Sequence, residues 1–331
     1  MFFSIITPIY QCSRETEEFL SSLLEQDYQN FEIILVEDGK KDSSKDVITK
    51  YQDKLDIKYF FIENTSVSYR RNYGMSVAKG DYFVFFDSDC IIPGDYFNIV
   101  RKEITKNNIK AWGGPDRDHQ SFSNLQKAIN YSMTSVFTTG GIRGGKKKVG
   151  KYHPRSFNMG IAKEVYEKTG GFPTVIQPGE DIIFSINIQR CGYQAHLIHE
   201  AFVYHKRKIS IKKYFKQISS FGFVRYPITL LFPDTFSPVF LLPSIYTLGV
   251  FMLVLMAVFI HPAFIIPLGL HYSLIFIDAG IKTKKINIAL LSIVTSFVQF
   301  CAYGSGFLKS VGTRYVLGKS AFFDKYGYSK L

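Results

Sequence analysis

The most informative stretch of this chain is Tyr82-Phe83-Val84-Phe85-Phe86-Asp87-Ser88-Asp89. Five apolar residues predict a buried strand, and two aspartates follow at its carboxyl end. Open α/β sheets bind their ligands just beyond the carboxyl ends of strands. Paired carboxylates suit a hard divalent cation that holds phosphate groups. The stretch therefore predicts an interior strand with a metal and phosphate site at its end.

The residues before this stretch alternate between strands and helices. Apolar runs predict strands at 2–7, 31–36 and 57–62, and amphipathic segments predict helices at about 13–26, 42–52 and 67–78. This order implies a mainly parallel, Rossmann-like α/β sheet with right-handed crossovers. After residue 89 the pattern predicts helices at about 93–106, 123–136 and 180–190, and short strands at 195–198 and 201–204.

The last third of the chain differs in charge and hydropathy. Residues 206–331 contain 15 of the 40 basic residues and three of the 28 acidic ones, so the 25 basic and 25 acidic residues of 1–205 balance. The excess positive charge therefore flanks apolar segments and does not lie on the folded front domain. This pattern favours anionic lipid headgroups as partners and argues against nucleic acid.

Two kinds of membrane segment are predicted in this third. Residues 206–225 contain seven basic and no acidic residues among apolar ones, which is typical of an amphipathic interface segment. Residues 235–277 contain no charged side chain, and 43 residues accommodate two spanning helices of about 20 residues with a turn at His261-Pro262. Residues 286–308 form a third uncharged run. We therefore predict an interface segment at 206–234 and two to three transmembrane helices at 235–331.

The orientation of these segments contains one conflict. Two crossings place both 206–225 and Lys282, Lys284 and Lys285 in the cytoplasm, as the positive-inside rule requires. A third full crossing would place the basic C-terminal residues outside. Either the third segment is re-entrant or interfacial, or the tail violates the rule. Four cysteines without paired spacing favour reduced thiols in the cytoplasm, and the start lacks the basic region of a signal peptide. Together with the apolar segments, these features predict a multi-pass protein of the inner or plasma membrane whose front domain is cytoplasmic.

The ordered motifs of the front half resemble those of family 2 glycosyltransferases with the GT-A fold. The matching residues are Thr7-Pro8-Ile9-Tyr10, Val36-Glu37-Asp38-Gly39, Arg71-Asn72, Phe86-Asp87-Ser88-Asp89, Asn158-Met159 and Gly179-Glu180-Asp181. The resemblance covers 1–205 and implies a GT-A catalytic domain there. The family usually has two aspartates where this chain has Glu37-Asp38, and this departure leaves the nucleotide base open.

The resemblance implies the roles of the donor and metal ligands. The predicted donor-binding residues are Pro8, Tyr10, Glu37, Asp38, Arg71, Asp87 and Ser88. Arg71 would contact the diphosphate with its fork of donors. The predicted metal ligands for Mg²⁺ or Mn²⁺ are Asp89, Asp87 and His205. The cation would neutralise the charge that develops on the departing nucleoside diphosphate.

The resemblance also implies the catalytic base and the acceptor contacts. Asp181 is the predicted general base, which removes the proton of the attacking hydroxyl. One base without an enzyme nucleophile implies direct displacement with inversion. Glu180 and Asn158 are predicted to contact the acceptor. Processive relatives contain a Gln-x-x-Arg-Trp motif, whereas Gln217-Ile218-Ser219-Ser220-Phe221 lacks both the Arg and the Trp, which favours one sugar per cycle.

Together these features predict transfer of a single sugar from a nucleotide sugar to a hydroxyl of a lipid-linked or glycan acceptor, in the synthesis of surface polysaccharide or glycoconjugate. The donor is expected to be uridine-linked and the acceptor polyprenol-linked. A competing hypothesis is transfer to polyprenyl phosphate itself, for which Arg143, residues 146–148 and Arg225 could supply a basic pocket. A processive polysaccharide synthase and a non-catalytic membrane scaffold also stay open at the level of sequence.

Overall fold

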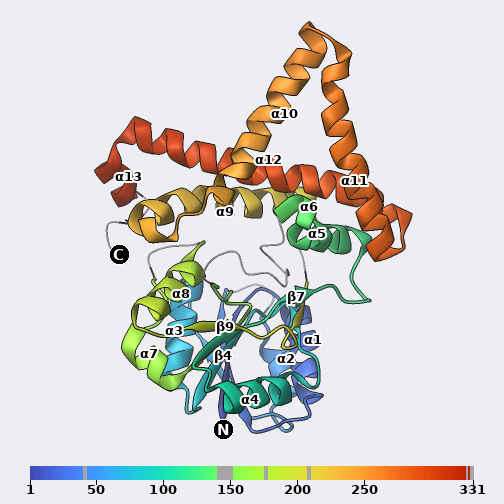
Figure 1. Cartoon of the computed structure of the whole chain (residues 1–331). Helices are drawn as coiled ribbons and strands as arrows, with labels where there is room; N and C mark the ends of the chain where they lie inside the picture. The colour runs from blue at the N-terminus through green and yellow to red at the C-terminus, as the bar shows by residue number, and fades with distance from the viewer. Residues whose placement is uncertain (40–42, 140–151, 175–177, 207–209, 326, 329–331) are drawn as a thin grey trace. The chain divides into compact units, whose positions relative to one another are not determined.

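The computed structural model of the chain describes residues 1–39, 43–139, 152–174, 178–206, 210–325 and 327–328 (Figure 1). The chain forms two compact units. The first comprises Met1–His119 and Val149–Lys206, and the second comprises Gln120–Lys148 and Arg207–Leu331. Arg143 and residues 146–148, which the sequence suggested for a phosphate pocket, lie outside the described residues.

The first unit contains the predicted sheet. Within the described residues it has seven strands in the order β3-β2-β1-β4-β8-β6-β9. Strands β3, β2, β1 and β4 are parallel, and β8 runs antiparallel between β4 and β6. The mainly parallel α/β fold is thus confirmed, and β8 is a strand that the sequence did not predict. The bounds are β1 (Phe3–Tyr10), β2 (Phe31–Asp38), β3 (Ile57–Phe61), β4 (Tyr82–Phe86), β6 (Ala111–Gly113), β8 (Asn158–Ala162) and β9 (Ala195–Leu197).

A small second sheet follows the end of β4. Strand β10 (Val203–His205) lies between β5 (Cys90–Ile91) and β7 (Asp116–Arg117). The antiparallel register of β5 and β10 pairs Cys90 with His205. This pairing brings the chain after residue 200 back to the carboxyl end of β4.

Helices cover both faces of the main sheet, because side chains in a strand alternate between its two faces. Phe3 and Ile5 pack with α1 (Ser13–Leu24), α2 (Lys45–Thr49) and α4 (Tyr96–Asn107). Ile6 and Phe85 pack with α3 (Val67–Val77), α7 (Lys163–Thr169) and α8 (Glu180–Arg190). Burial on both faces explains why these strands are continuously apolar in sequence.

The second unit is helical. It contains α5 (Asn124–Thr134), α6 (Val136–Thr139), α9 (Ile211–Leu231), α10 (Leu242–Phe259), α11 (Ile266–Thr283), α12 (Ile286–Leu317) and α13 (Lys319–Lys325). Ser123 caps α5 through a capping box with Gln126. Short 3₁₀ helices lie at Pro233–Thr235, Pro238–Leu241 and Pro262–Ile265.

Three helices among the described residues are long and apolar enough to cross a membrane. They span Pro238–Phe259, Pro262–Thr283 and Ile286–Leu317. The first two are separated at His261, which confirms the predicted turn between two apolar helices. The third extends past the predicted limit at residue 308. These helices indicate that the protein associates with a membrane.

Candidate active site

The polar residues of the first unit gather where β1, β2 and β4 end and where α8 begins. The end of β2 supplies Asp38, whose side chain accepts hydrogen bonds from the backbone amides of Asn64 (3.0 Å) and Thr65 (3.1 Å). Its Oδ2 lies 3.5 Å from Nη1 of Arg70. The same guanidinium lies over the ring of Tyr10 at 5.9 Å from its centroid. Asp38 and the exposed Tyr10 are thus joined through Arg70, a residue that sequence reasoning did not select.

Glu37 is fully buried beside this group. Its Oε2 accepts a hydrogen bond from the hydroxyl of Tyr59 (2.6 Å), and its Oε1 accepts one from the backbone amide of Ser44 (2.8 Å). Burial and the neighbouring Glu37 carboxylate raise the pKa of Tyr59 to about 12. Glu37 therefore anchors the chain that follows β2, and its predicted contact with a donor stays a prediction.

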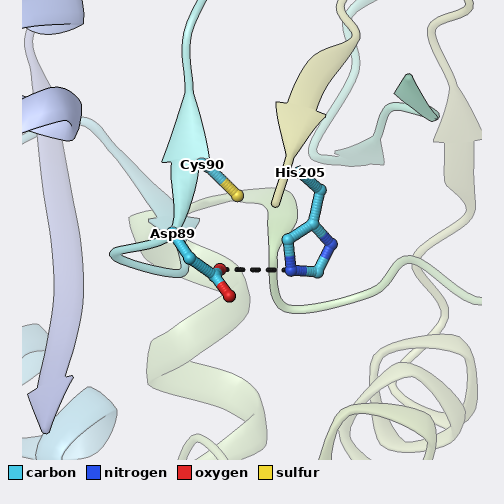
Figure 2. Close-up of side chains that lie close together, drawn as sticks. All are labelled: Asp89, Cys90 and His205. Carbon is cyan, nitrogen blue, oxygen red and sulfur yellow. Dashed lines mark ion pairs between the residues drawn. The ribbon is translucent and has the colours of Figure 1, made fainter. Parts of the chain in front are cut away.

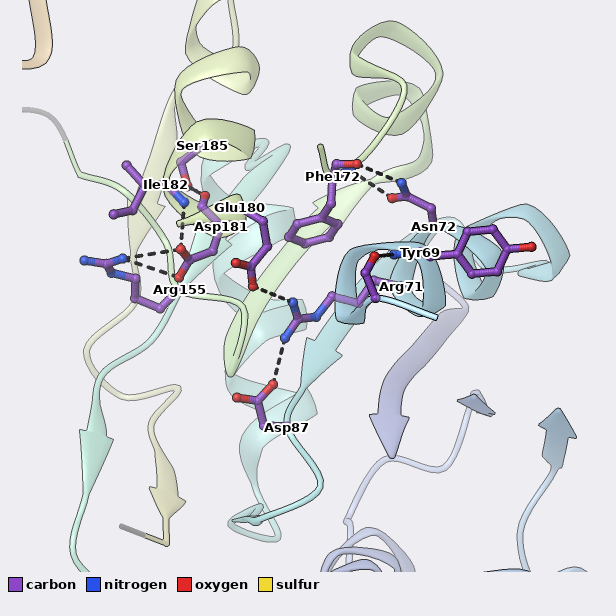
Figure 3. Close-up of polar contacts among 11 residues, drawn as sticks. Tyr69, Arg71, Asn72, Asp87, Arg155, Phe172, Glu180, Asp181, Ile182 and Ser185 are labelled. Carbon is purple, nitrogen blue, oxygen red and sulfur yellow. Dashed lines mark hydrogen bonds and ion pairs between the residues drawn. The ribbon is translucent and has the colours of Figure 1, made fainter. Parts of the chain in front are cut away.

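Arg71 connects the end of β4 with the start of α8 (Figure 3). Its Nη2 donates to Oδ1 of Asp87 at 2.9 Å, and its Nη1 donates to Oε1 of Glu180 at 3.1 Å. The residue is only 2% exposed, and its guanidinium lies 5.3 Å from the ring centroid of Phe172. One arginine thus holds two carboxylates that are far apart in sequence.

The carboxyl group of Glu180 lies in an unfavourable environment for a charge. Burial and the neighbouring Asp181 carboxylate raise the pKa of Glu180, while Arg71 opposes the rise. Glu180 and Asp181 occupy the first turn of α8, where the partial positive charge of a helix N-terminus favours carboxylates. Gly179, at φ 110°, adopts the left-handed conformation that turns the chain into this helix.

Asp181 faces a different cation. Nη1 of Arg155 lies 3.5 Å from its Oδ1 and 3.4 Å from its Oδ2 (Figure 3). Its Oδ1 also accepts a hydrogen bond from the backbone amide of Ile182 at 2.8 Å. These contacts hold the carboxylate in one orientation. The sequence analysis did not select Arg155, because the residues around it form no motif that indicates a functional site.

Asp89 meets His205 at the junction of β5 and β10 (Figure 2). Nε2 of His205 lies 3.1 Å from Oδ1 of Asp89. With Cys90 they form a group whose ligand atoms all lie within 4.8 Å of one another. The Cys90 thiol donates weakly to the Phe157 carbonyl at 3.6 Å. A carboxylate with an imidazole fits a divalent cation such as Mn²⁺, while Mg²⁺ prefers oxygen ligands alone.

The remaining predicted residues are Ser88, Pro8 and Asn158. Ser88 contacts the Cys12 thiol, whose pKa is raised by burial, with 3.1 Å between Oγ and Sγ. Pro8 is buried in β1. Asn158 is fully buried; its Oδ1 accepts from the Tyr96 hydroxyl (2.6 Å), and its Nδ2 donates to the Ala201 carbonyl (2.8 Å). Asn158 thereby supports the sheet, and its predicted contact with an acceptor stays a prediction.

Replacement of Arg71 by Met should destabilise the first unit by about 3 kcal/mol, because it leaves the buried Glu180 and the partly exposed Asp87 without their shared cation. The measurement is urea unfolding of the detergent-solubilised protein. Trp112 reports on it, since this fully buried residue of β6 is the only tryptophan of the chain. The matched control is Arg14→Met. The Arg14 side chain is 85% exposed and pairs with Glu18 on the same helix, so it should change stability by less than about 0.5 kcal/mol. Equal unfolding midpoints for the two variants would contradict a structural role for Arg71.

A mainly parallel sheet with arginine–carboxylate contacts and an Asp–His pair at its carboxyl edge is the arrangement expected of a GT-A transferase domain. Residues 4–170 match the family described as glycosyl transferase family 2. This match covers just over half of the chain. The chain therefore belongs to glycosyl transferase family 2, and its first unit is a glycosyltransferase domain.

Individual relatives agree with this family. An uncharacterized glycosyltransferase of Haemophilus influenzae is 40% identical over 94 residues, which is 28% of this chain and 38% of that protein. A Methanococcus voltae enzyme is 25% identical over 339 residues, covering 97% of this chain and 99% of that protein. It is named dolichyl N-acetyl-α-D-glucosaminyl phosphate 3-β-D-2,3-diacetamido-2,3-dideoxy-β-D-glucuronosyltransferase.

A solved structure shares the fold. The mannosyltransferase PcManGT from Pyrobaculum calidifontis, in complex with GDP-Man and Mn²⁺, matches with a TM-score of 0.57 at 15% identity. The match covers 96% of this chain and 87% of that chain. The chain spans little more than a third of the Haemophilus relative, whereas the Methanococcus voltae relative matches it over nearly its whole length.

Proposed function

We propose that the chain transfers a single sugar, with inversion, from a nucleoside-diphosphate sugar to a hydroxyl group of a lipid-linked glycan, with Mg²⁺ or Mn²⁺ as cofactor. One observation carries the proposal: a short series of contacts joins the predicted groups. His205 meets Asp89, Asp87 shares Arg71 with Glu180, and Asp181 follows Glu180 in the chain. These contacts support a proposal that places the donor, the metal and the base at one edge of one sheet.

The donor is proposed to bind along the ends of β1, β2 and β4. Pro8, Tyr10 and Asp38 would contact the base and ribose, and Glu37 would fix the loop beside them. Asp87 and Ser88 follow β4, where ribose and diphosphate would lie. The cation would be held by Asp89 and His205, with Asp87 nearby, and when bound it would supply Lewis-acid stabilisation of the departing diphosphate. Uridine diphosphate sugars are the first donors to test.

The transfer step needs one base. Asp181 would accept the proton of the acceptor hydroxyl while its oxygen bonds to the anomeric carbon. The bond from that carbon to the diphosphate oxygen breaks, and the nucleoside diphosphate leaves with the electron pair. Attack opposite to the leaving group inverts the anomeric centre. Arg155 would position Asp181 through the contacts of 3.4 and 3.5 Å.

The acceptor is proposed to be a sugar linked to a polyprenyl phosphate. The name of the full-length Methanococcus voltae relative describes an acceptor of this class. The apolar helices of the second unit are consistent with a lipid-linked substrate. We accordingly propose a location in the inner or plasma membrane, a cytoplasmic catalytic unit, and a role in the synthesis of surface polysaccharide or glycoconjugate.

A hydroxyl acceptor suits the site better than polyprenyl phosphate itself. A phosphate monoester already carries an anionic nucleophilic oxygen and needs no base. The adjacent carboxyl groups of Glu180 and Asp181 would also repel it. Arg225, which the sequence suggested for a phosphate pocket, lies over the ring of Phe240 in the second unit at 4.0 Å from its centroid.

Membranes that contain the full-length chain should consume one nucleotide sugar from a panel of uridine and guanosine diphosphate sugars. EDTA should abolish the reaction, and added Mn²⁺ or Mg²⁺ should restore it. The readout is incorporation of radiolabelled sugar into lipid-extractable product. Membranes without the chain serve as the control. Incorporation that persists in excess EDTA would refute metal dependence, and no incorporation from any donor would refute the activity.

A further inference from the structure

Helix α12 has two faces of different chemistry. Ile286, Leu290, Val294 and Phe297 are between 44% and 67% exposed. Their spacing of four, four and three residues places them on one face of the helix. The opposite side buries small hydroxyl residues, namely Ser292, Thr295 and Ser296. We call the exposed face, defined by residues 286, 290, 294 and 297, the apolar stripe.

The hairpin of α10 and α11 packs on the side of the apolar stripe. Gly304 follows Ile286 by 18 positions, or about five turns, and so lies on the same face. A Cβ atom at Gly304 would lie 2.2 Å from Oγ1 of Thr247 in α10. Phe300, one turn earlier, stacks on Tyr246 of α10 with 4.2 Å between ring centroids. The hairpin therefore begins on the same side of α12 as the stripe.

Helices α5 and α9 cover the other side. Thr295 follows Ile286 by nine positions, or about two and a half turns, and its Oγ1 donates to the Ala128 carbonyl of α5 at 3.0 Å. A Cβ atom at Gly306 would lie 2.1 Å from the Ser219 carbonyl of α9, so these helices cross in close contact. Figure 1 shows most of the hairpin on one side of α12 and both α5 and α9 on the other. The end of α11 also reaches α5, where the Tyr131 hydroxyl donates to Oδ2 of Asp278 at 2.6 Å.

The helices differ in how much of their apolar surface the protein covers. Of the most apolar 18 residues of each helix, 44% are buried in α12, whereas 6% and 11% are buried in the two helices of the hairpin. Most residues of the hairpin helices are thus exposed, as in lipid-surrounded helices, while α12 is exposed along one side. At 32 residues α12 is about 48 Å long, well beyond the hydrocarbon core of about 30 Å.

The lysines of α9 lie beside the middle of α12. Lys212, Lys213 and Lys216 are exposed in the first two turns of α9. Tyr214, which lies among them, donates a hydrogen bond to the side chain of Gln299 near the midpoint of α12. If α12 crossed the bilayer, these three cations would lie at the depth of the hydrocarbon core, where a charged side chain is strongly unfavourable.

We propose that α12 lies in the plane of the membrane surface, with its apolar stripe against the acyl chains, and that only the α10–α11 hairpin enters the bilayer. Lys309, Arg314, Lys319 and Lys325 then lie on the same side of the membrane as the lysines of α9, where they meet anionic headgroups. The conflict with the positive-inside rule disappears, because the chain returns to its side of entry after α11. This inference concerns the lipid surface and does not rest on the proposed sugar transfer.

Labelling of single cysteines in the full-length chain tests this topology. Cys12, Cys191 and Cys301 are changed to Ser, the buried Cys90 is kept, and this background must not react with a membrane-impermeant maleimide. One cysteine is then introduced in α9 (Lys212→Cys), before α12 (Lys285→Cys) or after α12 (Lys319→Cys), all at exposed positions. Inverted vesicles and intact spheroplasts are labelled in parallel, with an endogenous marker of each side as control.

Each of the three cysteines should react at least tenfold faster in one of the two preparations than in the other. The faster preparation should be the same for all three. Labelling of Lys319→Cys from the side opposite to Lys212→Cys and Lys285→Cys would show that α12 crosses the bilayer and would overturn the proposal. Release of the chain by alkaline carbonate would overturn it too, because an inserted hairpin resists extraction. Neither outcome depends on sugar transfer, so this inference and the proposed function fail separately.

Discussion

Asp181→Asn should reduce the rate of sugar transfer about 10³-fold while the affinity for the nucleotide sugar stays within twofold of the wild type. The amide has nearly the same shape and still offers an oxygen to the Ile182 amide and Arg155, but it cannot take up the proton of the acceptor hydroxyl. Initial rates of product formation report the transfer step. Titration of the donor in the presence of Mn²⁺ reports binding.

The matched control for this variant is Asp53→Asn, since Asp53 is an exposed aspartate of the same unit, located between α2 and β3. It should transfer sugar at the wild-type rate. Turnover of Asp181→Asn within twofold of this control would show that Asp181 is not the base. A parallel loss of donor binding would instead assign Asp181 to the donor site.

The sequence predicted the sheet well because its strands are local signals. Strands β1, β2 and β4 are mainly apolar, and burial on both faces favours such runs. Strand β3 lies at the edge of the sheet and is only partly buried, but its aromatic residues still predicted a strand. The α8 start at Glu180 was predicted for a similar reason, since glycine and acidic residues mark a helix start locally. Strand β8 was not predicted, because Asn158–Ala162 is short and its antiparallel place between β4 and β6 depends on distant partners.

The predicted site residues were selected from motifs, and motifs do not identify their partners. Arg70 and Arg71 are adjacent in α3, yet Arg70 pairs with Asp38 and Arg71 pairs with Asp87 and Glu180. Adjacent residues of a helix point in directions about 100° apart, and this difference alone gives the two arginines different partners. Arg155 escaped notice because its contact with Asp181 joins two segments that the sequence does not connect.

Helix α5 illustrates the same limit on a larger scale. The sequence predicted a helix at about 123–136, but not the element that covers its apolar face. In the structure Ile129 and Met133 of α5 pack with Ile218 of α9 and Val298 of α12. An amphipathic pattern specifies that one face of a helix is buried. Which element packs against that face is decided by tertiary packing alone.

Asp89→Ala should abolish sugar transfer, by at least about 10³-fold, and should also remove the effect of Mn²⁺ on donor binding. Asp89 is the carboxylate of the candidate metal group, and it lies 3.1 Å from His205. Without it, no carboxylate remains in this group to neutralise a cation, so the charge of the departing diphosphate would develop unopposed. Transfer and donor affinity are measured as functions of Mn²⁺ concentration.

The control and a second variant separate a metal site from a structural pair. Asp95→Ala changes an exposed aspartate whose side chain makes no capping bond, and it should behave as the wild type. His205→Ala distinguishes the two roles of the histidine. If His205 is a ligand, the Mn²⁺ concentration for half-maximal transfer rises about tenfold or more; if it only orients Asp89, the maximal rate falls at an unchanged Mn²⁺ requirement. Wild-type transfer by Asp89→Ala would contradict the metal site as a whole.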